Sequence, residues 1–245
     1  MIPEKYTYLF VDFFTLLFPL IFSFTRKFDF KNYWKFYFPV NITIAFLYIL
    51  WDSLYTSWGV WGFDLKYTLG ITVFNLPIEE ILFFVCIPYA CIFTYYCFRK
   101  YIFPRITLSL NVFWKISAFL FFLLGCAYPS LLYTMAAFFS CAIVFLLIDW
   151  FNMVNPNRTI SFTHFLLFYI LILIPFYIFN GILTGSFLNR VVVFYNDSEN
   201  LGIRILTVPF EDIFYGMGLI LAHILGFEYY MAQTSYKHRD RNVNL

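Results

Sequence analysis

The sequence predicts an all-α integral membrane protein with seven transmembrane helices, arranged as two parallel three-helix repeats joined by a connecting helix. The first observation is composition: 62% of the 245 residues are hydrophobic and only 12% are charged, whereas soluble domains carry about 25% charged residues. The second is a series of seven long apolar runs. The third is a short acidic motif that occurs at residues 77–80 and again at 209–212.

Each apolar run is long enough to be a membrane-spanning helix, which needs about 20 mostly apolar residues. The runs lie near residues 6–24, 38–56, 74–98, 111–128, 130–149, 162–184 and 207–230. The first is expected to stay in the membrane, because the basic segment 24–28 follows it and no small-residue cleavage site does. The five cysteines fall within apolar runs and are interpreted as small buried hydrophobic residues.

Basic residues predict the orientation, because cytoplasmic loops carry an excess of lysine and arginine. Of the 16 basic residues, twelve follow the first, third, fifth and seventh runs, and four lie on the other side. The four are Lys5, Lys66, Arg190 and Arg204. The amino terminus is therefore predicted to face outward and the carboxyl terminus the cytoplasm. Both acidic motifs then begin near the outer leaflet, at the same depth.

The acidic motif belongs to a longer internal repeat. Residues 70–81 read GITVFNLPIEEI and residues 202–213 read GIRILTVPFEDI, so that Gly-Ile, five residues and Pro-x-Glu-acid-Ile recur without a gap. Upstream, WDSLYT at 51–56 and FNGILT at 179–184 share an aromatic residue, Asp or Asn, and a threonine at the same spacing. The sequence therefore predicts two related halves.

The predicted organisation is a first three-helix repeat at residues 1–105, a connecting helix at 106–129 and a second repeat at 130–245. Two three-helix units joined directly would have opposite orientations in the membrane. One additional crossing makes them parallel, which brings the two acidic motifs to the same face.

Glu79, Glu80, Glu211 and Asp212 are the candidate catalytic residues. Each pair follows a proline at the start of a helix, where carboxylates favour the positive end of the helix dipole. Helix capping alone is an alternative role. Capping needs only one acid per helix, however, and an acidic residue that faces hydrocarbon carries a free-energy penalty. Converging carboxyls in a low dielectric cannot all ionise, so neutral acids and carboxylates are expected together. Adjacent positions lie about 100° apart on a helix, and Glu79 and Glu211 are expected to face the cleft.

The sequence resembles the membrane lycopene cyclase-domain family, in the fused single-chain form of the heterodimeric type. The resemblance rests on PIEE at 77–80, PFED at 209–212, WD at 51–52 and NGILT at 180–184. It implies redox-neutral cyclisation of the ψ ends of lycopene to β-ionone rings, giving β-carotene via γ-carotene. It also implies an isomerase in the cytoplasmic membrane of a bacterium, acting on lycopene or a related carotenoid that enters from the lipid bilayer.

Protonation of a terminal double bond would produce a carbocation, which aromatic faces stabilise. Residues near the acids in the sequence are therefore candidates for substrate binding. Asp52 and Asn180 either hydrogen-bond the acids or cap helix ends. The full set is Trp51, Asp52, Thr56, Trp58, Trp61, Phe83, Asn180, Thr184, Phe214 and Tyr215.

No cofactor, metal or nucleic acid is expected, and no flavin-binding G-x-G-x-x-G follows a strand. Two further polar residues have predicted places within the seventh run. His223 lies too far along the helix from Glu211 to share its site and is expected to form a helix-to-helix hydrogen bond. Glu228 is expected at the membrane interface.

The principal alternative function is a proton-coupled transporter of small solutes, since parallel three-helix repeats also build carriers. Carriers place polar residues near the midplane, whereas here the polar residues gather at one end. A retinal photoreceptor is a third class, and the seventh run has no lysine to form a Schiff base.

Overall fold

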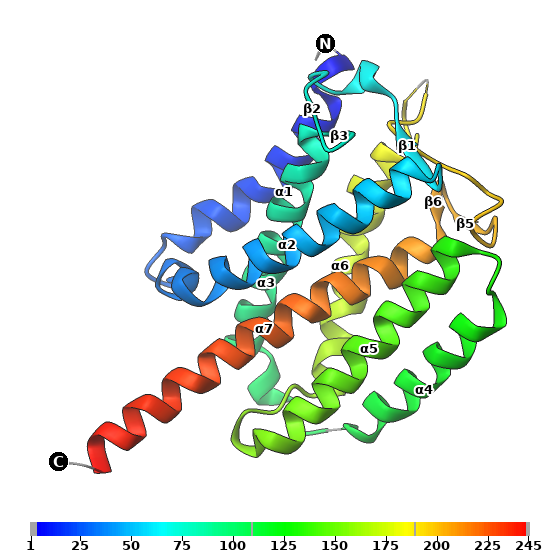
Figure 1. Cartoon of the computed structure of the whole chain (residues 1–245). Coiled ribbons are helices and arrows are strands. Elements are labelled where there is room, and N and C mark those ends of the chain that lie inside the picture. Colours follow the sequence, from blue (N-terminus) through cyan, green and yellow to red (C-terminus); the bar gives the residue numbers. More distant parts are fainter. Residues whose placement is uncertain (1–3, 109, 189, 244–245) are drawn as a thin grey trace.

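Seven apolar helices make up most of the chain in the computed structural model, which describes residues 4–108, 110–188 and 190–243, with side chains up to residue 233 (Figure 1). The basic side chains of Lys237, Arg239 and Arg241 lie outside the described part. The helices are α1 (Thr7–Ser23), α2 (Trp34–Ser57), α3 (Ile78–Tyr101), α4 (Val112–Ala127), α5 (Leu132–Val154), α6 (Phe162–Leu183) and α7 (Phe210–Val243).

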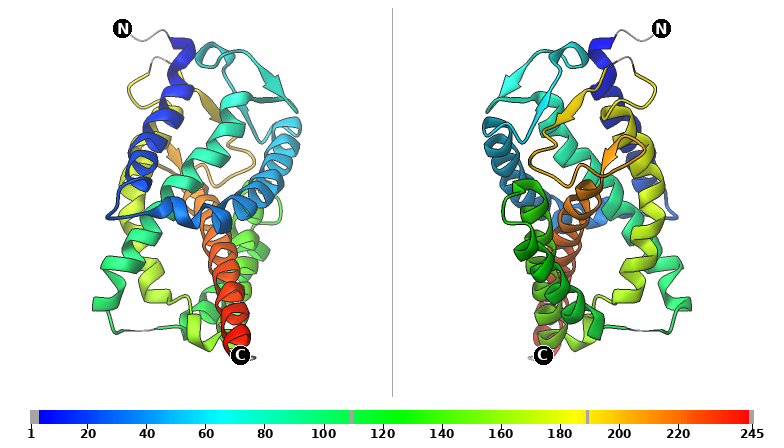
Figure 2. Two further views of the ribbon diagram at one scale, coloured as in Figure 1. Left: turned by 90° about the vertical axis from the view of Figure 1, so that its left-hand side faces the viewer. Right: turned by 90° about the vertical axis from the view of Figure 1, so that its right-hand side faces the viewer.

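The structure confirms the all-α membrane class. Within the described ranges, six helices are long and apolar enough to cross a bilayer, and α4 is a shorter apolar helix of 16 residues. At 1.5 Å per residue α4 extends about 24 Å, less than the roughly 30 Å of a hydrocarbon core. Successive helices run up and down, and the two ends of the chain lie at opposite ends of the bundle (Figures 1 and 2).

The part of the chain that the structure describes has three short pairs of strands, which lie at the end of the bundle near the amino terminus (Figure 1). β2 (Thr72–Val73) and β3 (Leu76–Pro77) form one hairpin, and β5 (Arg204–Ile205) and β6 (Val208–Pro209) form the other. Each hairpin leads directly into α3 or α7, which carry the acid pairs in their first turns. The third pair joins β1 (Trp61–Phe63) to β4 (Val193–Tyr195) and links the two halves of the chain.

Both hairpins are preceded by a glycine that the backbone requires. Gly70 has φ +75° and Gly202 has φ +67°, a conformation that residues with a Cβ seldom adopt. The two loops then close in the same way, because the backbone N–H of Ile78 donates to the carbonyl of Ile71 over 2.9 Å and that of Phe210 to the carbonyl of Ile203 over 2.9 Å. The repeated Gly-Ile is thus part of a repeated turn.

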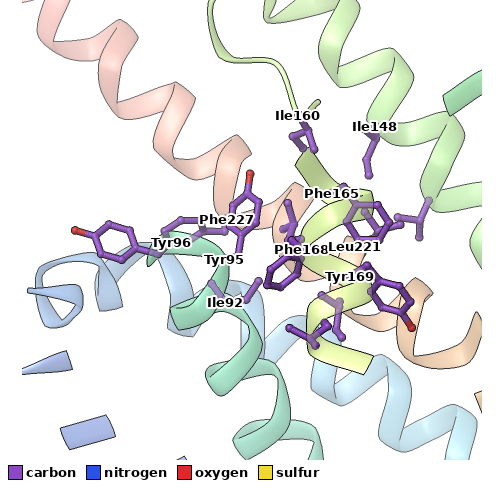
Figure 3. Packing of buried hydrophobic residues seen from close by; sticks show 14 of the residues in the cluster. Ile92, Tyr95, Tyr96, Ile148, Ile160, Phe165, Phe168, Tyr169, Leu221 and Phe227 are labelled. Carbon is purple, nitrogen blue, oxygen red and sulfur yellow. The ribbon is translucent and has the colours of Figure 1, made fainter. Parts of the chain in front are cut away.

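Aromatic side chains fill the largest buried cluster, which joins α3, α5, α6 and α7. Figure 3 shows part of it, with Tyr95 of α3, Phe168 of α6 and Phe227 of α7 lying together. The rings of Tyr95 and Phe168 meet edge-on with centroids 5.7 Å apart. Lipid tails are as apolar as these side chains, so close packing rather than exclusion from water holds such helices together. Edge-on ring pairs contribute about 0.5–1.5 kcal/mol each to that packing.

Two polar residues of α7 lie in this part of the bundle. His223 is buried and its Nε2 lies 3.2 Å from Nδ2 of Asn41 on α2, which confirms the predicted contact between helices. The interfacial depth expected for Glu228 stays a prediction, since burial within the bundle is compatible with that depth. Its side chain is buried, because Arg99 and Arg158 reach it from α3 and from the turn before α6 and neutralise its charge.

Candidate active site

The first acid of each motif holds the loop that precedes its helix. Oε1 of Glu79 accepts a hydrogen bond from the backbone N–H of Leu69 over 2.6 Å. Oε1 of Glu211 accepts one from the backbone N–H of Leu201 over 2.8 Å and another from Oγ1 of Thr134 over 2.6 Å. Both acids are fully buried. Oε1 of each acid therefore turns toward donors of the protein itself rather than toward an open space.

The expectation that Glu79 and Glu211 face the cleft is wrong. Glu80 and Asp212 line a cavity between the two halves of the chain, with a volume of about 80 Å³. The reason lies in the hairpins: each loop folds back over the helix start and places a free N–H beside the first acid of the pair. The second acid is rotated by about 100° and points inward.

The cavity walls are mostly apolar and aromatic, with a polar group at one end. Among the described residues that line it there is no lysine, arginine or histidine. The lining residues are Tyr8, Asp52, Trp61, Phe63, Glu80, Phe83, Ile87, Tyr133, Phe176, Asn180, Leu183, Val193, Tyr195, Asp212, Tyr215, Gly216, Leu219 and Ile220. We call this space the acid chamber. Its carboxyl groups have no basic side chain on the chamber wall to neutralise them.

Asp212 is held by three hydrogen-bond donors. Tyr133 donates to Oδ1 over 2.5 Å, and Asn180 and Tyr195 donate to Oδ2 over 2.7 and 2.9 Å. Burial, and then the adjacent charge of Asp212, raise the pKa of Tyr195 well above its ordinary value, so its hydroxyl keeps the proton that it donates. Both oxygens of the Asp212 carboxyl group therefore have hydrogen-bond donors.

Glu80 and Asp52 have fewer donors. Tyr8 donates to Oε2 of Glu80, and the indole N–H of Trp61 donates to Oδ1 of Asp52. Oδ2 of Asp52 is buried and has no hydrogen-bond partner among the described residues. The same holds for both carboxyl oxygens of Asp12, which lies one turn after Tyr8 on α1. Three buried carboxyl groups therefore gather on this side of the molecule with few donors between them.

Half of the predicted substrate-binding set lines the acid chamber, and half does not. The residues at the chamber wall are Asp52, Trp61, Phe83, Asn180 and Tyr215. Asn180 and Asp52 were expected either to hydrogen-bond the acids or to cap helix ends. Asn180 donates to Asp212, whereas Asp52 accepts from the indole N–H of Trp61.

The other half lies outside the chamber wall for reasons of packing. Trp58 is 60% exposed at the end of α2. Thr184 lies 2.8 Å from Oγ1 of Thr207, and Oγ1 of Thr56 is buried without a partner among the described residues. Phe214 packs on Phe138 of α5, with ring centroids 5.0 Å apart. Trp51 packs against the chamber residue Tyr215, with ring centroids 5.0 Å apart.

Three tyrosines that bind the chamber acids were missed by the sequence interpretation. Tyr8 and Tyr133 are each the second residue of a helix, α1 and α5, and each donates to the second acid of one motif. Their equivalent positions in the two repeats could have identified them from the sequence. No comparable feature of the sequence identified Tyr195 of β4, because its contact with Asp212 follows from the pairing of β4 with β1.

One comparison with known proteins identifies the family. A sequence model of the family described as lycopene cyclase matches residues 5–98 and again residues 130–230. No curated protein and no solved structure matches the chain. The two matched regions contain both acidic motifs and cover well over half of the sequence. The chain therefore belongs to the lycopene cyclase family.

Proposed function

We propose that the protein closes the ψ ends of lycopene into β-ionone rings by acid–base catalysis, giving β-carotene via γ-carotene. The observation that carries this proposal is the acid chamber, where Glu80 and Asp212, one from each motif, meet beside aromatic walls. The reaction adds one proton and removes another. It is an isomerisation without redox change, and its chemistry calls for no cofactor.

Glu80 and Asp52 form the proton-donating side. Both line the chamber. A buried carboxyl without a cation is costly when charged, so this pair holds a proton. Transfer of that proton to the terminal double bond of the ψ end starts the reaction. The new C–H bond leaves a tertiary carbocation, onto which the neighbouring double bond closes the ring.

Asp212 forms the proton-accepting side. Its three hydrogen-bond donors stabilise a carboxylate before substrate binds, and a carboxylate beside the new ring attracts the cation. Removal of a ring proton by Asp212 gives the ring double bond. The proton then returns to Glu80 or leaves to water.

The aromatic walls stabilise the cation between these two steps. Trp61, Phe83 and Tyr215 line the chamber, and the rings of Trp61 and Tyr215 lie 6.1 Å apart. A cation over an aromatic face gains about 0.5–2 kcal/mol per ring. The same rings exclude water, which would otherwise trap the cation as an alcohol.

We also propose the division into two parallel repeats at residues 1–105 and 130–245, with residues 106–129 as connector. Equivalent contacts support it, since the N–H of Leu69 meets Glu79 and that of Leu201 meets Glu211. The pairing of β1 with β4 is antiparallel, with Gly62 opposite Phe194. A local twofold axis passes through the centre of such a pair, as expected for two halves related by rotation.

The proposed location is the cytoplasmic membrane of a bacterium, with the amino terminus outside. Lys100 reaches the backbone of Lys27, which places two groups of basic residues at one end of the bundle. The few basic residues of the other side include Lys66, which pairs with Glu4 at 2.6 Å. A reporter fused after residue 245 should therefore report cytoplasm, and one fused before residue 1 should report the outside. The opposite pair of results would reverse the orientation and place the acid chamber near the inner leaflet.

Solvent deuterium tests the proposed reaction. Membranes containing the protein are equilibrated in D₂O and given lycopene at well below half a molar equivalent, so that the two rings formed per molecule remain fewer than the sites. The carboxyl that donates the proton is then deuterated, and each new ring should carry about one deuterium atom. Mass spectrometry of the separated carotenoids measures this, with membranes of the Glu80→Gln variant as the control. Unlabelled cyclic product would contradict donation by an exchangeable carboxyl. Absence of cyclic product from the folded protein would contradict the function and favour the transporter alternative.

A further inference from the structure

A second and larger cavity adjoins the acid chamber. It has a volume of about 480 Å³ and lies between α1, α3, α6 and α7. The two spaces share part of their walls, because six residues line both. These residues are Phe83, Ile87, Phe176, Asn180, Gly216 and Ile220. We call the larger space the α1–α6 groove.

The described residues that line the groove present almost no free polar group to a ligand. Its hydroxyl groups are already used: Thr15 donates to the carbonyl of Val11 over 2.8 Å, and Thr94 to that of Ala90 over 2.8 Å. Tyr169 donates to the carbonyl of Ile213 over 2.5 Å. The remaining walls are largely hydrocarbon and aromatic rings. A surface of this kind suits a long molecule without polar groups.

The groove also faces the surroundings of the bundle. α1 and α6 pack together near the chamber, where Tyr8 and Leu183 share a buried cluster, and diverge below it (Figure 1). Phe14 and Phe18 of α1 line the groove and are 46% and 60% exposed. From Phe83 to Thr94 the groove follows α3 for about 16 Å. Its open side would face lipid.

The first repeat has an aromatic residue at the position that corresponds to Gly216 in the second repeat. Gly216 stands four residues after Asp212, and Phe84 stands four residues after Glu80. Phe84 is 1% exposed, and its ring lies 6.0 Å from that of Tyr48 on α2. Tyr48 in turn packs against Tyr215 at 5.3 Å. Aromatic side chains therefore fill the space beside α2, whereas beside α6 a glycine leaves it open.

We propose that the α1–α6 groove holds the polyene chain of the substrate, and that Gly216 keeps the groove joined to the acid chamber. This inference rests on the proposed cyclase function. The linear polyene slides in from the bilayer with one ψ end in the chamber and the rest of the chain along α3 and α6. Only one end reaches the acids at a time, so a molecule must leave and turn around before its second ring forms.

Substitution at Gly216 tests the passage. A Cβ there would lie 3.6 Å from Oη of Tyr169 and 3.9 Å from the ring of Phe176, so a methyl group fits and a larger side chain fills the junction. Gly216→Phe should lower cyclisation by about 10²-fold, the scale of loss when a reacting group is misplaced. Gly216→Ala should retain much more activity than Gly216→Phe. Ile174→Phe is the matched control, since Ile174 is 62% exposed on α6 and does not line the groove.

Carbene footprinting provides a readout that needs no turnover. The Glu80→Gln protein in vesicles is labelled with a lipid-soluble diazirine, with and without lycopene. Lycopene should slow labelling of Leu173, which lines the groove, and leave labelling of its neighbour Ile174 unchanged. Equal labelling of Leu173 in both samples, or full activity of a folded Gly216→Phe protein, would overturn the groove assignment. A wild-type protein that makes no cyclic carotenoid would instead overturn the function, whatever the footprint shows.

Discussion

Glu80→Gln and Asp212→Asn should each lower the rate of lycopene cyclisation by about 10²–10⁴-fold, the usual contribution of a positioned acid or base. Glutamine at residue 80 keeps the size of the side chain and can still accept from Tyr8, but it has no acidic proton to give. Asparagine at residue 212 still accepts hydrogen bonds and cannot remove a ring proton. Separation of the pigments from lycopene-producing cells measures both losses.

The adjacent acids are the matched controls. Glutamine in place of Glu79 still offers an oxygen to the N–H of Leu69, so the loop before α3 keeps its anchor. The new amide N–H₂ would occupy the buried place of an oxygen that has no partner among the described residues. We expect Glu79→Gln to cost about 1–3 kcal/mol in stability and to lose far less activity than Glu80→Gln. A larger loss of activity in a folded Glu79→Gln protein would contradict the roles assigned to the two acids.

The second large effect concerns stability at the opposite end of the bundle. Glu228 is 2% exposed and binds Arg99, Arg158 over 2.8 Å and the hydroxyl of Tyr95 over 3.1 Å. Glu228→Gln leaves two guanidinium groups without their anion, one of them half-buried. Breaking a buried pair in this way costs about 3–5 kcal/mol, and unfolding of the purified protein in detergent should show that loss.

An exposed ion pair is the control that measures how much of the stability loss in Glu228→Gln comes from burial. Arg204 of β5 and Asp197 meet at 2.6 Å, and the side chain of Asp197 is 61% exposed. Asp197→Asn should change the free energy of unfolding by about 0–1 kcal/mol. Equal losses in the two variants would mean that Glu228 does not act as the buried anion of α7.

The membrane class and the seven helices could be predicted because bilayer thickness imposes a length on each helix separately. The runs near 38–56, 162–184 and 207–230 correspond to α2, α6 and α7 without reference to their neighbours. The repeated motif could also be recognised, because its residues have roles within their own segment of the chain. Its proline ends a strand, its acids occupy the first turn of a helix, and its glycine takes a positive φ in both copies.

Tertiary structure alone decided which acid of each pair faces the chamber. Helix geometry separates Glu79 from Glu80 by about 100°, but the direction of either depends on where the preceding loop places the N–H of Leu69. The tyrosines depend on contacts between distant segments, since 72 residues separate Tyr8 from Glu80 and 79 separate Tyr133 from Asp212. The groove depends on the divergence of α1 from α6 and on a single glycine of α7 at its junction with the chamber. A local pattern specifies how a segment folds, whereas a site assembled from six helices and a strand pair exists only once those elements pack together.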